Sequence, residues 1–320
     1  MTVLIEAVGL HKRFGDIKAV NGISLKVAKG EVLGFLGPNG AGKSTTMKMI
    51  TGFLEPDAGL ASICGIDVFK EPKNAKAKFG YVPEGAPSYG EMTTRAFLSF
   101  IAEIRGYRGA AIVSRVANAV ERAGLGPVLD QVIDTLSKGY KRRVGLAQAI
   151  LHDPPVLIMD EPTDGLDPNQ KHHVRNLITD MAADKAIIIS THILEEVEAV
   201  CSRAVVINKG VIVADGTADD LLQRMHYHGA VSLKVVADRA DAAIRALTNA
   251  AAIASVETLG KPNGHLLLRA IPHQKTMTAA EVAAVLRAQN IPVDELYVER
   301  GRLDDVFRKI TMPEEGDSNA

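Results

Sequence analysis

The sequence predicts an α/β domain followed by a smaller α+β domain, and three observations support this fold class. The stretch "EVLGFLG" reads as an apolar strand that runs into the glycine-rich loop "GPNGAGKST" and then into the helical pattern "KSTTMKMI". Two continuous apolar runs, "PVLIMD" and "AIIIS", are typical of strands buried on both faces of a parallel sheet, and a helical stretch separates them. After residue 230, the order strand, helix, strand, strand, helix, strand indicates a ferredoxin-like unit.

The remaining segments extend this outline in chain order. "TVLIEAV" and "ISLKV" alternate in hydrophobicity as half-buried strands do, and "FGYVPEG" ends a further strand. Residues 92–126 have helical periodicity, with an apolar stripe at Ile112, Val116, Val120 and Ala123. We expect this stripe to be core, with the wall of a docking groove as the alternative. A short helix, "LDDVFRKI", closes the second domain, and we expect residues 312–320 to form a disordered tail.

Composition restricts the class of protein further. A chain of 320 residues with 47% hydrophobic content is long enough for two domains. The formal net charge of -1 provides no overall field to recruit nucleic acid or anionic lipid. Cys64 and Cys201 fit no metal or redox spacing, which favours reduced thiols in a cytosolic protein. The N-terminus resembles a strand rather than a secretory segment, and no window approaches the roughly eighteen apolar residues of a membrane span.

The glycine-rich loop carries the most specific motif. Residues Gly37 to Thr45 satisfy the pattern G-x-x-x-x-G-K-[ST], in which glycines allow backbone N–H groups to surround phosphates. The following helix directs its positive end at the same anion. Lys43 can reach the terminal phosphates and Ser44 can ligate Mg²⁺. A glycine-rich turn that merely connects two elements is the alternative, but the position between a buried strand and a helix favours phosphate binding.

Three polar residues follow the buried strands. Asp160 and Glu161 end "VLIMDE", and His192 follows "AIIIST", so all three are expected at the carboxyl edge of the sheet, where α/β folds bind ligands. We predict that Asp160 faces a metal ion, that Glu161 orients or deprotonates an attacking water, and that His192 hydrogen-bonds a phosphate oxygen. A capping Asp-Glu pair and a structural histidine are the alternatives.

The stretch "TLSKGYKRRVGLAQAI" predicts a helix capped by Ser137, yet its first turns carry four cations. Positive charge at a helix N-terminus opposes the helix macrodipole unless an anion offsets it. The four cations are Lys138, Lys141, Arg142 and Arg143.

Taken together, the order and spacing of these motifs resemble those of ABC transporter ATP-binding subunits over residues 3–222. "LSKGY" is similar to the signature motif of that family, "GLDP" to its D-loop and "STH" to its switch histidine. The resemblance implies a P-loop NTPase core with a mixed sheet, an antiparallel β subdomain and a helical signature subdomain at about 85–150. It also implies a linker at 223–230 and an accessory domain at 231–311.

The resemblance assigns roles to individual residues. It implies that Phe14 stacks on adenine beside Val20, that Glu84 stands where most relatives carry a metal-binding glutamine, and that Asp167 belongs to the D-loop. It further implies that Ser137 and Gly139 contact the γ-phosphate held by a partner chain. The phosphate-binding residues are then Asn39, Gly40, Ala41, Gly42, Lys43, Ser44 and Thr45.

Glu84, Lys138 and Tyr140 depart from the commonest motifs and resemble the group that serves drug export, polysaccharide export and gliding motility. In such ATPases, two subunits bind ATP and Mg²⁺ between them and drive a polytopic membrane permease. We therefore expect an ATP-hydrolysing exporter subunit, peripheral on the cytoplasmic face of the membrane, dimeric, and with no nucleic-acid partner. A soluble ABC-type ATPase acting on ribosomes or DNA is the alternative, and a ligand-sensing role for the accessory domain is a further one.

Overall fold

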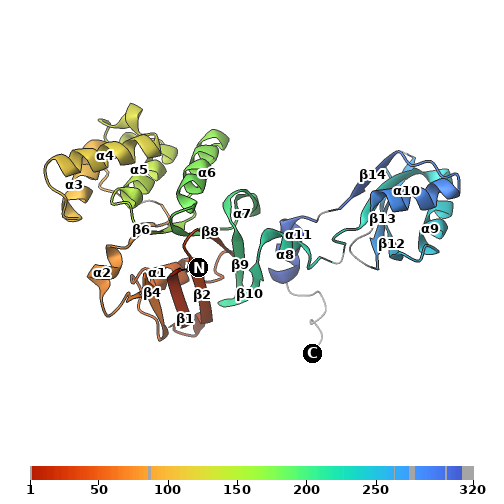
Figure 1. The fold of residues 1–320 in the computed structure, drawn as a ribbon, viewed down its shortest axis with the longest axis horizontal. Coiled ribbons are helices and arrows are strands. Elements are labelled where there is room, and N and C mark those ends of the chain that lie inside the picture. The colour runs from red at the N-terminus through yellow and green to blue at the C-terminus, as the bar shows by residue number, and fades with distance from the viewer. Residues whose placement is uncertain are drawn as a thin grey trace. The chain divides into compact units, whose positions relative to one another are not determined.

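The computed structural model describes residues 2–85, 88–225, 227–262, 264–273, 278–299 and 301–311. By its internal contacts the chain divides into two compact units, Met1–Ala218 and Asp219–Ala320 (Figure 1). The division falls within the short helix α8 (Ala218–Leu222), close to the boundary expected at residue 222. Residues 312–320, expected to be a disordered tail, lie outside the described residues.

A six-stranded mixed sheet forms the centre of the first unit. Its order is β10-β9-β3-β8-β7-β6, and only β10 runs antiparallel to its neighbour. β3, β7 and β8 are buried along their whole length, which explains why their sequences are continuous apolar runs. The strands are β3 (Val32–Leu36), β6 (Phe79–Val82), β7 (Val156–Asp160), β8 (Ala186–Thr191), β9 (Arg203–Asn208) and β10 (Val211–Gly216).

A second, antiparallel sheet has the order β2-β1-β4-β5. Its two long strands replace the shorter segments expected from the sequence, because bulges allow β1 and β2 to pair over twelve residues each. Helix α1 (Lys43–Ile50) contributes Met47, Met49 and Ile50 to the core shared with both sheets. The strands are β1 (Val3–Phe14), β2 (Ile17–Ala28), β4 (Ala58–Ile63) and β5 (Ile66–Asp67), and helix α2 (Pro72–Lys76) follows.

Helices make up most of the chain between β6 and β7. Val116, Val120 and Ala123 of α4 are buried in the core with α5, so the predicted apolar stripe is mainly core. Ser137 caps α5 and accepts a hydrogen bond from the Tyr140 amide, which confirms the predicted start of that helix. The elements are α3 (Thr94–Ile104), α4 (Ala110–Ala123), η1 (Gly126–Val128), η2 (Ile133–Thr135) and α5 (Lys138–Ile150); α6 (Pro168–Ala182) and α7 (Leu194–Val200) come later.

Helix α5 is fixed directly on the central sheet. A Cβ atom at Gly80 of β6 would lie 2.1 Å from the carbonyl oxygen of Ala149 in α5. A larger residue at this position would push the helix away, so glycine here sets the distance between α5 and the sheet edge.

The second unit has the predicted order of elements and a four-stranded antiparallel sheet of order β12-β13-β11-β14. Helices α9 and α10 pack on one face of this sheet and bury Leu233, Leu268 and Leu286. This is the ferredoxin-like arrangement predicted from the sequence. The elements are β11 (Val231–Val236), η3 (Ala237–Arg239), α9 (Ala240–Thr248), β12 (Ile253–Gly260), β13 (His265–Pro272), α10 (Ala279–Ala288), β14 (Glu295–Val298) and α11 (Leu303–Thr311).

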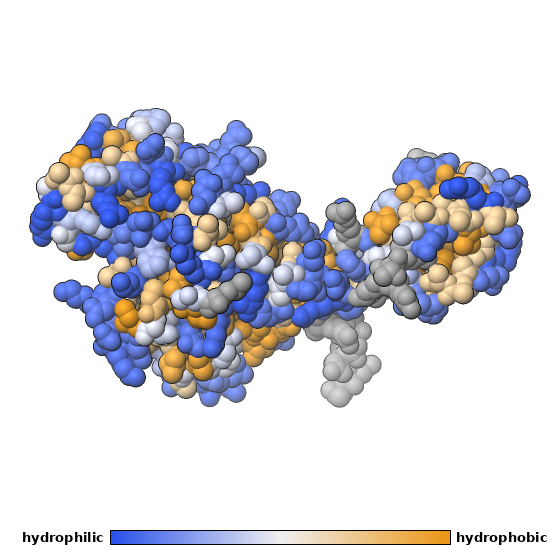
Figure 2. All heavy atoms as spheres, in the orientation of Figure 1, coloured by the Kyte–Doolittle hydropathy of each residue, from blue (hydrophilic) through white to orange (hydrophobic). Residues whose placement is uncertain are grey.

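Among the described residues, no helix is long and apolar enough to cross a bilayer. Figure 2 shows hydrophilic residues over much of the drawn face of the first unit and a broader apolar area on the drawn face of the second unit.

A polar network centred on Arg269 fixes α11 in the second unit. Its guanidinium bonds the Glu299 carboxylate at 2.9 Å and lies 4.3 Å from the ring centroid of Tyr227. The Tyr227 hydroxyl in turn donates to Asp305 of α11 at 2.5 Å. A guanidinium matches a carboxylate in shape and can also stack on an aromatic ring, so one side chain connects three segments.

We expect Arg269→Met to lower the free energy of unfolding of the second unit by about 2 kcal/mol, because Glu299 would keep a largely buried charge without its partner. Native-state hydrogen exchange of β13 and β14 amides in the full chain measures this change. The matched control is Lys234→Met, which breaks a more exposed pair with Glu295 and should cost about 0.5 kcal/mol or less. Equal effects of the two substitutions would contradict the central role of Arg269.

Candidate nucleotide-binding site

The phosphate-binding loop connects the end of β3 to the start of α1. Gly42 has φ +105°, and a Cβ atom there would lie 2.3 Å from the carbonyl oxygen of Ala19, so only glycine fits. No side chain caps the N-terminus of α1, which leaves its first N–H groups free to bind an anion. The loop therefore has the local geometry that the sequence motif predicts.

A cavity of about 450 Å³ opens at this loop. It brings together residues from β1, the phosphate loop, the end of β6 and the end of β7. Its lining includes nine of the predicted site residues: Phe14, Asn39, Gly40, Gly42, Lys43, Ser44, Thr45, Glu84 and Glu161. Phe14 lies at the edge of the cavity and is 49% exposed. An aromatic side chain needs an exposed face of this kind in order to stack on a base.

Two predicted residues near the loop do not line this cavity. Val20 is 2% exposed and belongs to the hydrophobic core, and its neighbour Ala19 lines the cavity in its place. The side chain of Ala41 is also buried, and its carbonyl accepts a hydrogen bond from the Gly210 amide.

The two carboxylates at the end of β7 have different environments. Asp160 is 2% exposed and accepts a hydrogen bond from the Ser190 hydroxyl. Glu161 has φ +49°, a conformation that is uncommon for a non-glycine residue, and its amide donates to the Ser190 carbonyl at 3.0 Å. This conformation turns the Glu161 side chain toward the cavity, whereas Asp160 stays behind it. Backbone strain of this kind is often found at functional sites.

His192 lies directly beside Glu161. Its Nδ1 is 3.0 Å from both carboxylate oxygens of Glu161, and its side chain is half exposed. Burial raises the pKa of Glu161, and Asp160 adds to this, while the hydrogen bond from His192 and the charge of Lys43 oppose it. A carboxylate with a raised pKa is a better proton acceptor than a fully solvated one.

Lys43 faces the same carboxylates. Its ammonium group is largely buried and donates to the carbonyl oxygens of Gly37 at 2.7 Å and Pro38 at 3.3 Å. Burial lowers the pKa of Lys43, and Glu161, Asp160 and Glu84 counteract this. The charge is held by carbonyl groups inside the loop, at the place where phosphates are expected.

The oxygen ligands of this region suit Mg²⁺. Ser44 and Glu84 line the cavity and provide a hydroxyl and a carboxylate, and the buried Asp160 precedes the cavity residue Glu161 in the chain. Mg²⁺ typically takes one or two carboxylates and completes its shell with water and substrate phosphates. The described residues contain no cluster of three or more His, Cys, Asp or Glu that could hold a metal ion by themselves.

Ser137, Gly139 and Asp167 do not line the cavity of their own chain. Ser137 caps α5, and Asp167 caps α6 by accepting from the Gln170 amide at 2.9 Å. A Cβ atom at Gly139 would overlap the side chain of Gln170, so the starts of α5 and α6 are packed together. Gly139 and Asp167 both contact Gln170, and none of the three residues lines the loop cavity.

One buried side chain, which the sequence did not single out, connects the ends of β7 and β8. Glu196 of α7 is 2% exposed and accepts hydrogen bonds from Thr163 and, at 2.9 Å, from Thr191. It thereby fixes the segments that follow Glu161 and precede His192. The only sequence signal was an acidic residue in the first turn of a helix, which is too common to single it out.

The comparisons with known proteins agree with this geometry. The ABC transporter family matches residues 20–164. The linearmycin resistance ATP-binding protein LnrL of Bacillus subtilis is 33% identical over 309 residues, 96% of this chain and 98% of that protein. The Nod factor export ATP-binding protein I of Burkholderia orbicola is 41% identical over 215 residues, 67% of this chain and 71% of that protein. A solved ATP-binding subunit of an ABC transporter superposes with a TM-score of 0.64 at 33% identity, over 69% of this chain and 92% of that one.

The fold and the cavity define a P-loop ATPase. The chain belongs to the ABC transporter family, as an ATP-binding subunit of the export type. It binds and hydrolyses ATP, and ATP-binding subunits of this family work in pairs together with membrane permease components. This confirms the predicted fold class and the main function, in preference to a soluble ATPase of ribosomes or DNA.

We expect Glu161→Gln to reduce ATP turnover at least about 100-fold while ATP binding is retained, because an amide cannot accept the proton of the attacking water. Steady-state hydrolysis and binding of a fluorescent ATP analogue measure the two effects. The matched control, Glu195→Gln, changes an exposed acid in the first turn of α7 and should leave turnover within about twofold. Undiminished hydrolysis by Glu161→Gln would contradict the assignment.

Proposed function

We propose that this chain is the ATPase of an exporter and that two copies bind two ATP molecules between them. The observation that carries the proposal is the single cavity that combines the phosphate loop with Phe14, Glu84 and Glu161. In this proposal Phe14 stacks on adenine, with Ala19 rather than Val20 at the cavity wall. Residues 39–45 hold the phosphates, and the ATPase domain spans residues 1–222, with the linker at 223–230 and the accessory domain at 231–311.

The residues of the cavity then divide the work of hydrolysis. Ser44, Asp160 and Glu84 would hold Mg²⁺, which would supply positive charge to the phosphates. Lys43 contacts the terminal phosphates, and Glu161 orients the water and accepts its proton. His192 holds the Glu161 carboxylate through the bond at 3.0 Å and, in this proposal, hydrogen-bonds a γ-phosphate oxygen. Catalysis is therefore mostly positioning and electrostatic stabilisation.

The second copy completes the site in this proposal. Ser137 and Asp167 are exposed at the starts of α5 and α6, with Gly139 buried between them, so a nucleotide on a facing copy can reach this surface. The exposed Lys138 adds positive charge at the start of α5, where a phosphate would offset it. The positive charge at the start of α5 can therefore be offset by a phosphate that the facing copy holds.

We expect Ser137→Asp to prevent ATP-driven dimerisation of a Glu161→Gln background. Aspartate still caps α5, so the helix is kept, but its charge repels the γ-phosphate. Size-exclusion chromatography with light scattering measures the dimer fraction with and without ATP. Ser137→Thr keeps both the cap and the hydroxyl and should still dimerise. A dimer that survives Ser137→Asp would exclude this residue from the interface.

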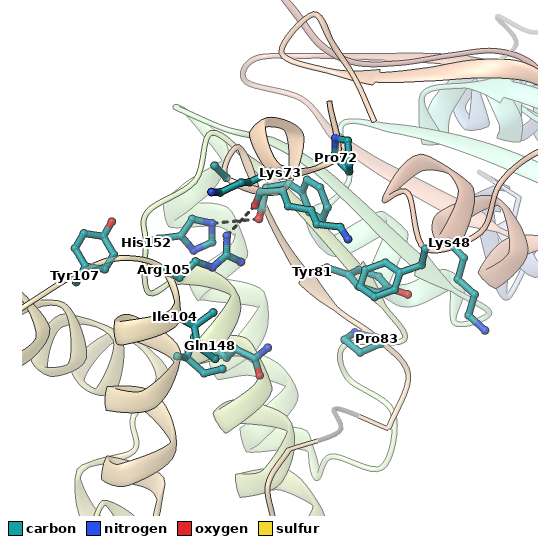
Figure 3. A pocket seen from close by; sticks show the side chains of 15 residues that line it. Lys48, Pro72, Lys73, Tyr81, Pro83, Ile104, Arg105, Tyr107, Gln148 and His152 are labelled. Carbon is teal, nitrogen blue, oxygen red and sulfur yellow. Dashed lines mark hydrogen bonds between the residues drawn. The ribbon is translucent and has the colours of Figure 1, made fainter. Parts of the chain in front are cut away.

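We further propose that a permease segment docks in a larger pocket of about 1070 Å³ beside β6. Its lining combines exposed apolar residues, including Phe53 at 63% and Ile104 at 64% exposure, with a positive rim. Figure 3 shows Arg105 and His152 close together in this pocket, where Arg105 donates to the Lys76 carbonyl at 2.8 Å. Burial and the charge of Arg105 lower the pKa of His152 to about 4, so the rim charge comes from lysine and arginine.

The chemistry of the pocket favours a short amphipathic segment with acidic residues. Apolar surface provides affinity, while the rim provides orientation through Lys48, Lys73, Lys76 and Arg105. The location of the chain follows from this partner: it is peripheral on the cytoplasmic face of the cell membrane. No nucleic-acid partner is proposed.

Affinity purification from detergent-solubilised membranes tests the partner. We expect a polytopic protein to co-elute with the chain, and co-elution of ribosomes or DNA instead would overturn the proposal. The double substitution Lys73→Glu and Lys76→Glu should reduce recovery of the permease at least about tenfold, because the rim then repels acidic groups. Lys26→Glu is the control, since Lys26 lies on β2 and pairs with Glu6 at 2.8 Å.

A further inference from the structure

Glu196 is a buried carboxylate that the proposed division of work leaves without a role. It lies in the first turn of α7 and is 2% exposed. One of its oxygens accepts a hydrogen bond from the Thr163 hydroxyl, and the other accepts from the Thr191 hydroxyl at 2.9 Å. Both threonines are buried as well. A buried carboxylate is unfavourable unless hydrogen bonds satisfy it, and here each oxygen has its own donor.

The two threonines flank the pair of side chains on which the proposed hydrolysis depends. Thr163 follows Glu161 by two residues, and Thr191 directly precedes His192. The carboxylate oxygens of Glu161 and Nδ1 of His192 are 3.0 Å apart. Glu196 therefore connects the two chain segments that carry this pair, although it does not itself line the nucleotide cavity.

The backbone at Glu161 needs support of this kind. Its φ of +49° is a conformation that a non-glycine residue keeps only where the surrounding structure enforces it. One restraint is the hydrogen bond from the Glu161 amide to the Ser190 carbonyl at 3.0 Å. The hydrogen bond from Thr163 to Glu196 restrains the chain on the other side of Glu161.

The segment that carries His192 is restrained from the same carboxylate. Thr191 Oγ1 donates to Glu196 and accepts from the Ile193 amide at 3.1 Å. The backbone is therefore held immediately before and immediately after His192. The position of the imidazole relative to Glu161 depends on both restraints.

Attachment of α7 to the sheet does not require a carboxylate. The neighbouring Val197 is 1% exposed and packs on β3, where a Cβ atom at Gly34 would lie 3.2 Å from the Val197 side chain. An apolar residue in place of Glu196 could be buried there without the desolvation penalty of a charge. Two directional hydrogen bonds, in contrast, fix the distance between the segments that follow β7 and β8.

We propose that Glu196 is a positioning residue for ATP hydrolysis, which holds the Glu161 and His192 side chains at their mutual distance through its two threonine partners. The inference rests on the proposed roles of Glu161 and His192. Glu196 neither contacts the nucleotide nor takes part in proton transfer. Its loss should therefore slow the chemical step and leave the affinity for ATP unchanged, because the phosphate loop follows a different strand.

The first test compares kcat with KM for ATP in the full chain. Glu196→Leu removes both hydrogen bonds, and we expect it to lower kcat at least about tenfold while KM stays within about twofold. Glu196→Gln keeps polar groups that can bond both threonine hydroxyls, so it should retain kcat within about threefold of the unmodified chain. Thr163→Val and Thr191→Val each remove one hydrogen bond and should each lower kcat at unchanged KM.

The second test separates positioning from a general loss of stability. In a Glu161→Gln background the carboxylate that Glu196 positions is already disabled. Adding Glu196→Leu should then lower the residual hydrolysis of radiolabelled ATP by less than about threefold.

The matched control is Glu31→Leu. Glu31 is a half-buried acid just before β3, at the end of that strand opposite the phosphate loop, where it bonds Arg203 at 3.0 Å. Its replacement should lower the thermal midpoint of unfolding but leave kcat within about twofold.

Three results would overturn the inference. They are an equal loss of kcat from Glu196→Leu in both backgrounds, a KM that rises as far as kcat falls, and a Glu31→Leu variant that loses as much kcat as Glu196→Leu. Should Glu196→Leu fail to fold, Thr163→Val and Thr191→Val must still lower kcat at unchanged KM, or the inference fails. An unmodified chain that hydrolyses ATP, together with an inactive Glu161→Gln variant, keeps the proposed function intact whatever the Glu196 variants show.

Discussion

Four parallel strands of the first unit end at one edge of the central sheet, and the site depends on this alignment. The phosphate loop follows β3, Glu84 follows β6, Glu161 follows β7 and His192 follows β8. Because hydrogen-bonded neighbours are held a few ångströms apart, residues separated by more than a hundred positions in sequence reach one cavity. The continuous apolar sequences of these strands bury the sheet on both faces, and the same strands position the residues of the site at their ends.

Charge balance is the second constraint on the site. Asp160 and Glu161 are adjacent and poorly solvated, which would be unfavourable without compensation. The compensation is local and specific: Ser190 donates to Asp160, His192 donates to Glu161, and Lys43 lies between the loop carbonyls and both acids. Arg142 of α5 is influenced by the same carboxylates. Gly80 of β6 lets that helix lie close to the sheet.

In the second unit, a polar network holds the closing helix α11 in addition to the apolar core. Its core is small and apolar, and α11 is attached through the polar network of Arg269, Glu299, Tyr227 and Asp305. Polar networks of this kind are directional, because each bond needs a defined donor and acceptor geometry. The closing helix consequently has a defined position on its own unit, although its sequence is short and strongly charged.

The sequence alone determined the fold class, the phosphate loop and the strand-end carboxylates, because each of them depends on a local pattern. The patterns are the continuous apolar runs of the strands, the glycines of the loop and the polar residues at the strand ends. It also determined the start of α5 from one capping serine. Tertiary structure decided what depends on packing between distant segments: that Val20 is core while Ala19 reaches the cavity, that Glu196 joins two strand ends, and that Arg142 faces the acids of the site while Lys141 does not. Adjacent residues on a helix or strand point in different directions, and only the packed neighbours show which direction meets the site.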